Sequence, residues 1–309
     1  MQIAEAAALI ERIIENIERV IVGKREAVEQ LMVALIAGGH VLLEDVPGVG
    51  KTMLARSLAA SIGGTFRRLQ FTPDLLPGDV TGVSIYHQKQ GEFVFCPGPI
   101  FANIVLADEI NRTSPRTQSA LLEAMDELQV TVDGVSYPLP TPFMVIATEN
   151  PIEYEGVYPL PESQLDRFLL KFSLGYPERE HERKIIRAQL LEHPINTLQP
   201  VTEAEAIAAL RRTAAQCYVS DYVYDYVLDL VRATRTEGSL YLGAGPRGSI
   251  ALVRCAQALA TIRGRDFATP DDVQQIAVAA LAHRLVPRSK TWRSDLTGDS
   301  VVENVLNSI

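Results

Sequence analysis

The sequence predicts an open parallel α/β sheet with helices on both faces and inserted β-hairpins, followed by a smaller all-α domain. Three observations predict this fold. Between residues 41 and 173, short apolar runs of strand length alternate with helical patterns. A glycine-rich turn at residues 45–50 joins the first strand to the next helix. From Glu178 onward the chain shows helical patterns and no run typical of a strand.

Two helices are predicted before the sheet. In residues 3–20, isoleucines recur every three or four positions between charged residues, which is typical of an amphipathic helix. Residues 21–23 interrupt this helix, and residues 26–37 resume a helical pattern. Gly38 and Gly39 then end the second helix just before the first strand.

The turn after the first strand has the composition of a phosphate-binding loop. Gly48 and Gly50 let the backbone approach an anion and turn amide N–H groups toward it, beside the positive end of the next helix. Lys51 is placed to contact the β- and γ-phosphates of a nucleotide, and the Thr52 hydroxyl to ligate Mg²⁺. The residues expected to bind the nucleotide here are Pro47, Gly48, Val49, Gly50, Lys51, Thr52 and Met53.

Asp45 departs from the generic phosphate-loop pattern, because it stands where that pattern has its first glycine. A carboxylate beside a triphosphate is repulsive unless its side chain points away. For this loop alone, an ordinary glycine-rich turn between a strand and a helix is the alternative interpretation.

A second acidic strand end supports the nucleotide site. Residues 104–107 form an apolar strand that runs directly into Asp108 and Glu109. Asp108 is expected to reach the Mg²⁺ held by Thr52, and Glu109 to act as the general base or water-orienting residue opposite the γ-phosphate. An acidic turn without function is the alternative, and it becomes the minor one once a phosphate loop precedes it.

Asn150 closes the strand expected at residues 143–147. Its neutral amide is suited to hold the attacking water without the cost of a further charge. The alternative is an Asx-turn before Pro151.

The other elements of the first domain follow from local patterns. Alternation predicts a strand at residues 66–71 and a hairpin over residues 83–95. Asp133 and Gly134 predict a type I′ turn in a second hairpin, residues 130–137. Two helices and a last strand are expected at residues 114–128, 162–168 and 169–173.

The change of pattern after the last strand divides the chain into two domains. We expect a nucleotide-binding core with its N-terminal helix over residues 1–192, and an all-α lid domain with a C-terminal tail over residues 193–309. The tail from residue 287 is more polar and is expected to be partly mobile. Helices of the lid are expected to begin near Thr202, Ser220, Gly248 and Pro270.

The composition of the chain excludes several classes of function. The net charge of −9 argues against a dedicated nucleic-acid surface, although it leaves room for a locally basic pore. The three cysteines and five histidines have no ligand spacing, so no metal site is expected among them, and the cysteines are expected to be buried small hydrophobes. No apolar run has the length of a membrane span and no basic leader is seen, so a cytoplasmic protein is expected.

Taken together, the motifs resemble those of the MoxR family of AAA+ ATPases, over nearly all of residues 20–283. Asp45 departs from the generic loop but not from the form this family accepts, whereas Glu149 stands where the family usually has Gln. The segments that carry the resemblance are VIVGKREAVEQLMVAL, LLEDVPGVGKT, FTPDLLPGDVTG, FCPGPIFANIVLADEINR, SALLEAMDELQVTVDG, ATENPIEYEGVYPLPESQLDRFLLK and GAGPRG.

The resemblance implies residue roles that spacing alone does not give. Ile21 and Val22 match the family's adenine-side segment. For Arg167 and Arg247, a surface ion pair is the alternative interpretation without the family match. The implied roles are Walker B for Asp108 and Glu109, sensor 1 for Asn150, arginine finger for Arg167 and sensor 2 for Arg247.

The resemblance also implies an activity and partners. It implies hydrolysis of ATP with Mg²⁺ in a homo-oligomeric ring, expected to be a hexamer, with both hairpins lining the pore or contacting clients. MoxR-like proteins resemble chaperones that mature partner proteins or insert cofactors or metals into them, and these partners often carry a von Willebrand factor A domain. We expect the lid to move with the nucleotide, with Arg247 reaching the γ-phosphate across the hinge at residues 194–200.

Three other functions remain open at this stage. A magnesium-chelatase-like motor subunit shares the core and both hairpins. A nucleic-acid motor of the minichromosome-maintenance type is disfavoured by the acidic charge balance. A nucleotide-gated scaffold with little turnover fits everything except an intact Glu109 and Arg167.

Overall fold

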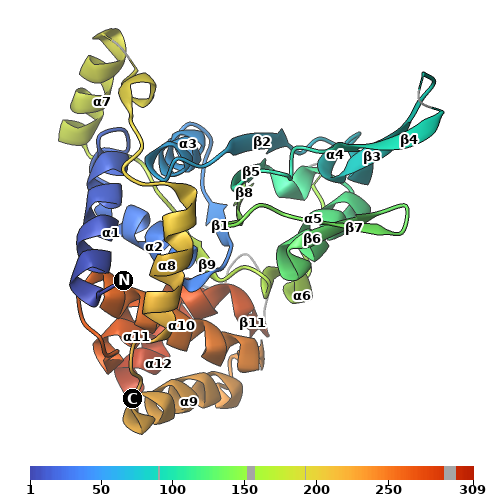
Figure 1. Cartoon of the computed structure of the whole chain (residues 1–309). Coiled ribbons are helices and arrows are strands. Elements are labelled where there is room, and N and C mark those ends of the chain that lie inside the picture. Colours follow the sequence, from blue (N-terminus) through green and yellow to red (C-terminus); the bar gives the residue numbers. More distant parts are fainter. Residues whose placement is uncertain (90, 152–156, 192, 289–296) are drawn as a thin grey trace.

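The computed structural model describes residues 1–89, 91–151, 157–191, 193–288 and 297–309. Its centre is a sheet of five parallel strands in the order β2-β5-β8-β1-β9 (Figure 1). The fold class predicted from the sequence is confirmed. The strands are β1 (Val41–Glu44), β2 (Phe66–Gln70), β5 (Ile104–Asp108), β8 (Met144–Glu149) and β9 (Leu170–Phe172).

The two faces of the sheet bury two separate hydrophobic clusters, because successive side chains of a strand point to opposite faces. In β1, Val41 and Leu43 belong to one cluster and Leu42 to the other. Helix α3 (Lys51–Ser61) contributes to the first cluster, and α5 (Pro115–Glu127) to the second. The sheet is therefore covered on both faces, as parallel sheets generally are.

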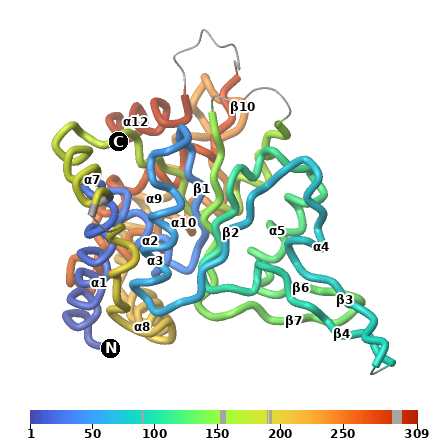
Figure 2. The backbone as a smooth tube through the Cα atoms, turned by 90° about the horizontal axis from the view of Figure 1, so that it is seen from above, coloured from blue at the N-terminus to red at the C-terminus, as the bar shows by residue number. Residues whose placement is uncertain are grey.

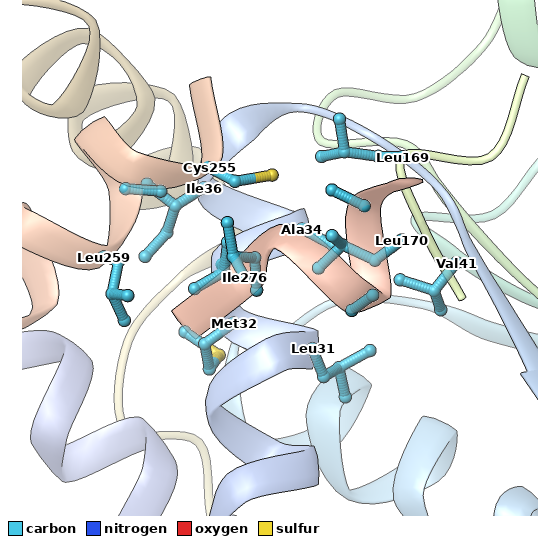
Figure 3. Packing of buried hydrophobic residues seen from close by; sticks show 14 of the residues in the cluster. Leu31, Met32, Ala34, Ile36, Val41, Leu169, Leu170, Cys255, Leu259 and Ile276 are labelled. Carbon is cyan, nitrogen blue, oxygen red and sulfur yellow. The ribbon is translucent and has the colours of Figure 1, made fainter. Parts of the chain in front are cut away.

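The first cluster continues from the sheet through the N-terminal helices into the C-terminal helices. Helix α2 (Arg25–Ala37) contacts β9, α8 and α10. Figure 3 shows this packing, in which Ala34 of α2 lies between Leu170 of β9 and Ile276 of the C-terminal region. The C-terminal helices are α8 (Ala204–Ala215), α9 (Asp221–Thr236), α10 (Pro246–Ile262), α11 (Pro270–Leu281) and α12 (Gly298–Ser308). The N-terminal helix α1 (Ile3–Glu18) packs on α2, α3 and α10.

Both predicted hairpins are present. They are β3 (Gly82–His87) with β4 (Glu92–Pro97) and β6 (Gln129–Val132) with β7 (Val135–Pro138), and they project together from one side of the molecule (Figure 2). Asp133 and Gly134 have φ values of 51° and 80°, as a type I′ turn requires. Phe95 stacks on Tyr137 with 4.0 Å between ring centroids, which ties one hairpin to the other.

The lid contains one feature that the sequence did not predict, a two-stranded antiparallel sheet of β10 (Leu240–Leu242) and β11 (Val286–Pro287). The expectation of no strand after Glu178 was wrong in this detail. Both strands are too short to show alternation, and they come from segments that are far apart in the chain. The pairing therefore leaves no local pattern.

Two smaller expectations also need correction. Cys96 is exposed, whereas Cys217 and Cys255 are buried as expected. The end of the expected mobile tail is the packed helix α12, which buries Val301, Val302 and Val305. Residues 289–296 of the tail, Gln90 of the first hairpin and residues 152–156 of the stretch after Asn150 lie outside the described residues.

Three connecting α-helices and three 3-10 turns complete the described part of the chain. The helices are α4 (Pro77–Thr81), α6 (Glu162–Leu165) and α7 (Arg179–Leu191), and the turns are η1 (Ile110–Arg112), η2 (Pro194–Thr197) and η3 (Ala282–Arg284). Within the described part of the chain, no helix is both long and apolar enough to cross a membrane.

Candidate active site

The glycine-rich loop lies between the carboxyl end of β1 and the start of α3. Gly48 and Gly50 have φ values of 87° and 104°, in the left-handed region that glycine adopts without strain. Gly50 is the N-cap of α3, so the helix starts at the loop and directs its free N–H groups toward it. This backbone geometry is the one that an anion site requires.

Lys51 is the cation of this loop. Its Nζ donates a hydrogen bond to the main-chain oxygen of Asp45 at 2.7 Å. Burial lowers the pKa of Lys51, and the carboxylates of Asp45, Asp108 and Glu109 oppose that shift. A nearby phosphate would also favour the charged form, because it would offset the cost of burial.

The carboxylate of Asp45 points away from the loop. Its Oδ2 accepts hydrogen bonds from the N–H groups of Leu174, at 2.5 Å, and Gly175, at 3.0 Å. These residues follow β9, so the Asp45 side chain is bound to the carboxyl end of the neighbouring strand. It does not occupy the position expected for the phosphates. This arrangement removes the repulsion that Asp45 would otherwise cause.

Asp108 ends β5 and is held on both of its oxygens. Thr148 Oγ1 donates to Oδ1 at 2.6 Å, and Arg68 donates to Oδ2 from Nε at 3.0 Å and from Nη2 at 2.6 Å. Arg68 was not predicted as a site residue. It lies two residues before Gln70, which is the register partner of Asp108 in the parallel pair β2-β5. Only the pairing of these two strands reveals it.

Glu109 follows Asp108 with a left-handed backbone, φ 57° and ψ 52°. Its N–H donates to Thr148 Oγ1 at 2.9 Å. Its Oε2 accepts a hydrogen bond from Gln70 Nε2 at 2.6 Å and forms an ion pair with Arg112 Nη1 at 2.9 Å. The side chain is therefore held between β2 and η1.

These groups meet in one pocket of about 310 Å³ at the carboxyl edge of the sheet. It combines loop N–H groups and a lysine with two carboxylates and the buried Asn150, which suits a phosphate chain with an oxygen-bound cation. The pocket is lined by Pro47, Gly48, Gly50, Lys51, Thr52, Met53, Arg68, Asp108, Glu109 and Asn150.

A second pocket of about 350 Å³ adjoins the other side of the loop. Ile21 and Val22 line it, as the adenine-side prediction requires, together with Val49. Tyr176 and residues of α7 also line this pocket, and no local pattern in the sequence predicts them. The lining includes Ile21, Val22, Pro47, Gly48, Val49, Gly50, Met53, Tyr176, Pro177, Ile185, Ile186, His193 and Pro194.

Arg167 and Arg247 lie elsewhere, in a third pocket of about 420 Å³. Both face the carboxylate of Asp126, with Arg167 Nε at 3.3 Å and Arg247 Nη2 at 3.9 Å from its Oδ2. Arg247 Nη1 also lies 3.8 Å from Asp166 Oδ2. The two arginines thus form one cluster, which lines no part of the phosphate pocket.

This cluster belongs to the opposite edge of the sheet. His40 and Leu169, which also line the third pocket, precede β1 and β9, whereas the phosphate loop follows β1 (Figure 1). One strand length therefore separates the arginines from the loop. In this structure Arg247 lines the third pocket and not the phosphate pocket, so it lies away from the γ-phosphate position of its own subunit.

Comparison with known proteins identifies the class first. Residues 40–170 match the model of the ATPase family associated with various cellular activities (AAA), and residues 232–305 match that of the AAA lid domain. The crystal structure of a presumed ATPase from Cytophaga hutchinsonii superimposes with a TM-score of 0.92 at 36% identity, covering 99% of this chain and 96% of that one. The chain is therefore an AAA-type P-loop ATPase with a helical lid, an ATP hydrolase.

Closely related sequences then identify the family. The chain is 43% identical to Chaperone MoxR1 of Mycobacterium tuberculosis over 97% of this chain and 81% of that protein. It is 52% identical to the uncharacterized protein YeaC of Bacillus subtilis, over 97% of this chain and 94% of that protein. The chain belongs to the MoxR family of AAA+ ATPases.

Proposed function

We propose that this ATPase works as a ring of identical subunits, expected to be a hexamer, in which each ATP lies between the phosphate pocket of one subunit and the arginine cluster of the next. One observation carries the proposal: the phosphate pocket and the pair Arg167 and Arg247 lie at opposite edges of the same sheet. A head-to-tail interface joins opposite faces of a subunit, and it generates a ring when the rotation between neighbours closes.

Within one subunit, Lys51 and the loop N–H groups bind the β- and γ-phosphates. Thr52 and Asp108 are the residues that would hold Mg²⁺, and their hydroxyl and carboxylate oxygens are the ligands this ion prefers. The fit is supported by Asp108 Oδ2, which already accepts a cationic partner, Arg68, in the pocket. When bound, Mg²⁺ supplies positive charge that neutralises the phosphate oxygens.

Glu109 orients the attacking water and accepts its proton, and Asn150 helps to hold that water. Arg167 and Arg247 of the neighbouring subunit stabilise the charge that develops on the γ-phosphate. An arginine finger of this kind contributes about 10³ to 10⁵ in rate.

For the use of this activity we propose a chaperone-like role in the cytoplasm. It consists of remodelling partner proteins, or of inserting a cofactor or metal into them, with clients that include proteins with a von Willebrand factor A domain. The relative named Chaperone MoxR1 supports this role. The exposed Phe93 and its register partner Tyr86 in the first hairpin support it as well, since their neighbouring rings offer an apolar surface to a client.

A motor subunit of a magnesium chelatase is a second candidate. The chain is 30% identical to the magnesium-chelatase subunit ChlI of Nephroselmis olivacea over 65% of this chain and 56% of that protein. Stimulation of the ATPase by chelatase partner subunits, with no response to a von Willebrand factor A protein, would favour this candidate.

A mixing experiment tests the shared site. Arg167→Ala subunits keep a complete phosphate pocket, whereas Glu109→Gln subunits keep a complete arginine cluster. Each is expected to be inactive alone, because loss of a finger raises the barrier by about 4 to 7 kcal/mol. Mixed in equal amounts under subunit exchange, they should recover up to about a quarter of wild-type activity, since a quarter of heterologous interfaces then combine both intact parts.

The matched control mixes Lys51→Ala with Glu109→Gln subunits, in which every phosphate pocket is defective, and it should recover nothing. Subunit exchange is followed by energy transfer between labelled subunits. If exchange occurs and the first mixture stays as inactive as the control, Arg167 does not act across the interface.

A further inference from the structure

Arg284 is a buried cation of the lid, with 7% of its surface exposed. It ends η3, directly after helix α11, within the part of the chain that matches the AAA lid. Its contacts cross to the other domain, to the segment 166–169 that carries Arg167. Arginine is rarely buried unless its guanidinium is paired with acceptors. These contacts therefore account for the burial of Arg284.

The guanidinium of Arg284 donates hydrogen bonds to several acceptors of this segment. Nε donates to Asp166 Oδ1 at 2.9 Å, Nη2 to the main-chain oxygen of Phe168 at 2.7 Å, and Nη1 to that of Leu169 at 3.2 Å. The planar fork of arginine suits such a set of acceptors, because its donors are fixed relative to one another. Residues on both sides of Arg167 are thus bound to one lid side chain.

The rest of the segment is also fixed. Phe168 is fully buried in the second hydrophobic cluster, and the N–H of Leu169 donates to the oxygen of His40 at 2.8 Å. Arg167, between these anchors, keeps 30% of its side chain exposed and pairs with Asp126. The residues after Arg167 are therefore anchored to the core, whereas the side chain of Arg167 itself is partly exposed.

The lid also carries Arg247, and Asp166 contacts both lid arginines: Arg284 through Oδ1 and Arg247 through Oδ2. The lid therefore holds Arg247 and the residue before Arg167 in one set of contacts, and a shift of the lid disturbs both together.

We infer that Arg284 is a positioning residue that couples the lid to the arginine finger, so that the subunit presents Arg167 and Arg247 to its neighbour's nucleotide as one unit. The inference rests on the proposed shared site. It means that lid movement in one subunit changes catalysis in the phosphate pocket of the next, with no contact between Arg284 and the nucleotide.

Arg284→Lys tests the coupling, because it keeps the charge and loses the fork. A misplacement of the order of 1 Å in a catalytic group costs about 100-fold in rate, so kcat should fall by roughly that factor. The KM for ATP should stay within about twofold, since the subunit's own phosphate pocket contains no part of Arg284.

Mixing separates positioning from general damage. Arg284→Lys subunits should regain activity with Glu109→Gln subunits, which supply a good finger, and should regain none with Arg167→Ala subunits. Asp166→Asn, at a partly exposed partner, should give the same pattern with a smaller loss, and it decides the matter if Arg284→Lys does not fold. The control Arg265→Lys alters another lid ion pair, with the buried Asp272 at 2.6 Å, and should keep wild-type turnover.

The inference is overturned if Arg284→Lys, or Asp166→Asn in its place, keeps wild-type kcat. It is also overturned if the variant fails to recover with Glu109→Gln while Arg167→Ala does recover in parallel. If neither mixture recovers although subunits exchange, the shared site itself is refuted, and the coupling with it. The Arg167→Ala mixture thus tells the two failures apart.

Discussion

Gln70 and Glu109 are joined by a hydrogen bond of 2.6 Å, from Gln70 Nε2 to Glu109 Oε2. Gln70 ends β2 and Glu109 follows β5, its neighbour in the sheet. The bond engages the carboxylate that is proposed to orient the attacking water. Each turnover must therefore release Glu109 from Gln70 or work against this contact.

Gln70→Ala is expected to raise the basal kcat of the ATPase about fivefold. A net hydrogen bond contributes about 1 kcal/mol, which corresponds to that factor in rate if it is lost before the transition state. Steady-state ATPase assays at saturating ATP measure the effect. Arg67→Ala, on the same strand but outside the phosphate pocket, is the control. An unchanged or lower kcat for Gln70→Ala at unchanged KM would show that Gln70 supports Glu109 instead of restraining it.

Lys51 and Glu109 should separate binding from turnover. Lys51→Ala is expected to abolish ATP binding, because Lys51 neutralises phosphate charge in the ground state. Glu109→Gln should bind ATP with near-wild-type affinity and lose turnover, because Glu109 acts mainly on the water. Calorimetric titration with ATP and an ATPase assay distinguish them. Equal loss of affinity in both variants contradicts the assignment. The Glu109→Gln variant, which should hold ATP, is also the bait for isolating a client.

A pH dependence of stability is expected at Glu149, beside Asn150. Burial raises the pKa of Glu149 from 4.5 to about 7, nearby Glu44 adds to the rise, and Lys171 opposes it. Because this pKa lies above the unfolded value, the folded state holds the extra proton between about pH 4.5 and 7. Stability contributed by this group is full at low pH and is lost as pH rises through that window.

Glu149→Gln should remove this loss of stability at higher pH, because glutamine does not ionise. Relative to wild type, its free energy of unfolding should be unchanged near pH 4 and higher by about 1 to 3 kcal/mol above pH 7. Urea unfolding at a series of pH values measures the difference. Glu92→Gln is the control, because Glu92 is an exposed glutamate of the first hairpin, away from Glu149. A difference between Glu149→Gln and wild type that does not grow with pH rules the mechanism out.

The parts of the fold that local patterns encode were predicted correctly. Strands β1, β5 and β8 appear as apolar runs and β2 as an alternation of apolar and polar residues, and Asp133 with Gly134 marks the second hairpin. The phosphate loop was recognisable because Gly48, Gly50 and Lys51 lie within four residues of one another. Each of these signals is a property of neighbours in the chain.

What the sequence could not supply depends on contacts between distant segments. Gln70 and Arg68 reach the two acidic residues only because β2 pairs with β5 in the register Gln70 to Asp108. Arg284 looks like any surface arginine until η3 packs on the segment 166–169. Hydrophobic periodicity does not encode strand order or the docking of the lid.

The position of Arg247 predicts when nucleotide protects the lid from hydrogen exchange. A lid arginine that senses its own subunit's ATP would respond to nucleotide in an isolated subunit, but Arg247 shares Asp126 with Arg167 at the edge away from the phosphate loop. A ligand shifts a conformation only through differential contact. Hydrogen exchange at residues 243–249 should therefore slow with ATP, relative to ADP or no nucleotide, in assembled protein and not in diluted subunits.

The phosphate loop provides the internal control for this measurement. Amides of residues 48–52 belong to the subunit's own pocket and should be protected by ATP in both the assembled and the diluted protein. Arg167→Ala rings retain Arg247 and should keep part of the protection at residues 243–249. If that segment responds to ATP equally in diluted and assembled protein, Arg247 acts within its own chain. If it responds in neither while the loop does, Arg247 is no nucleotide sensor and the pair with Asp126 is structural.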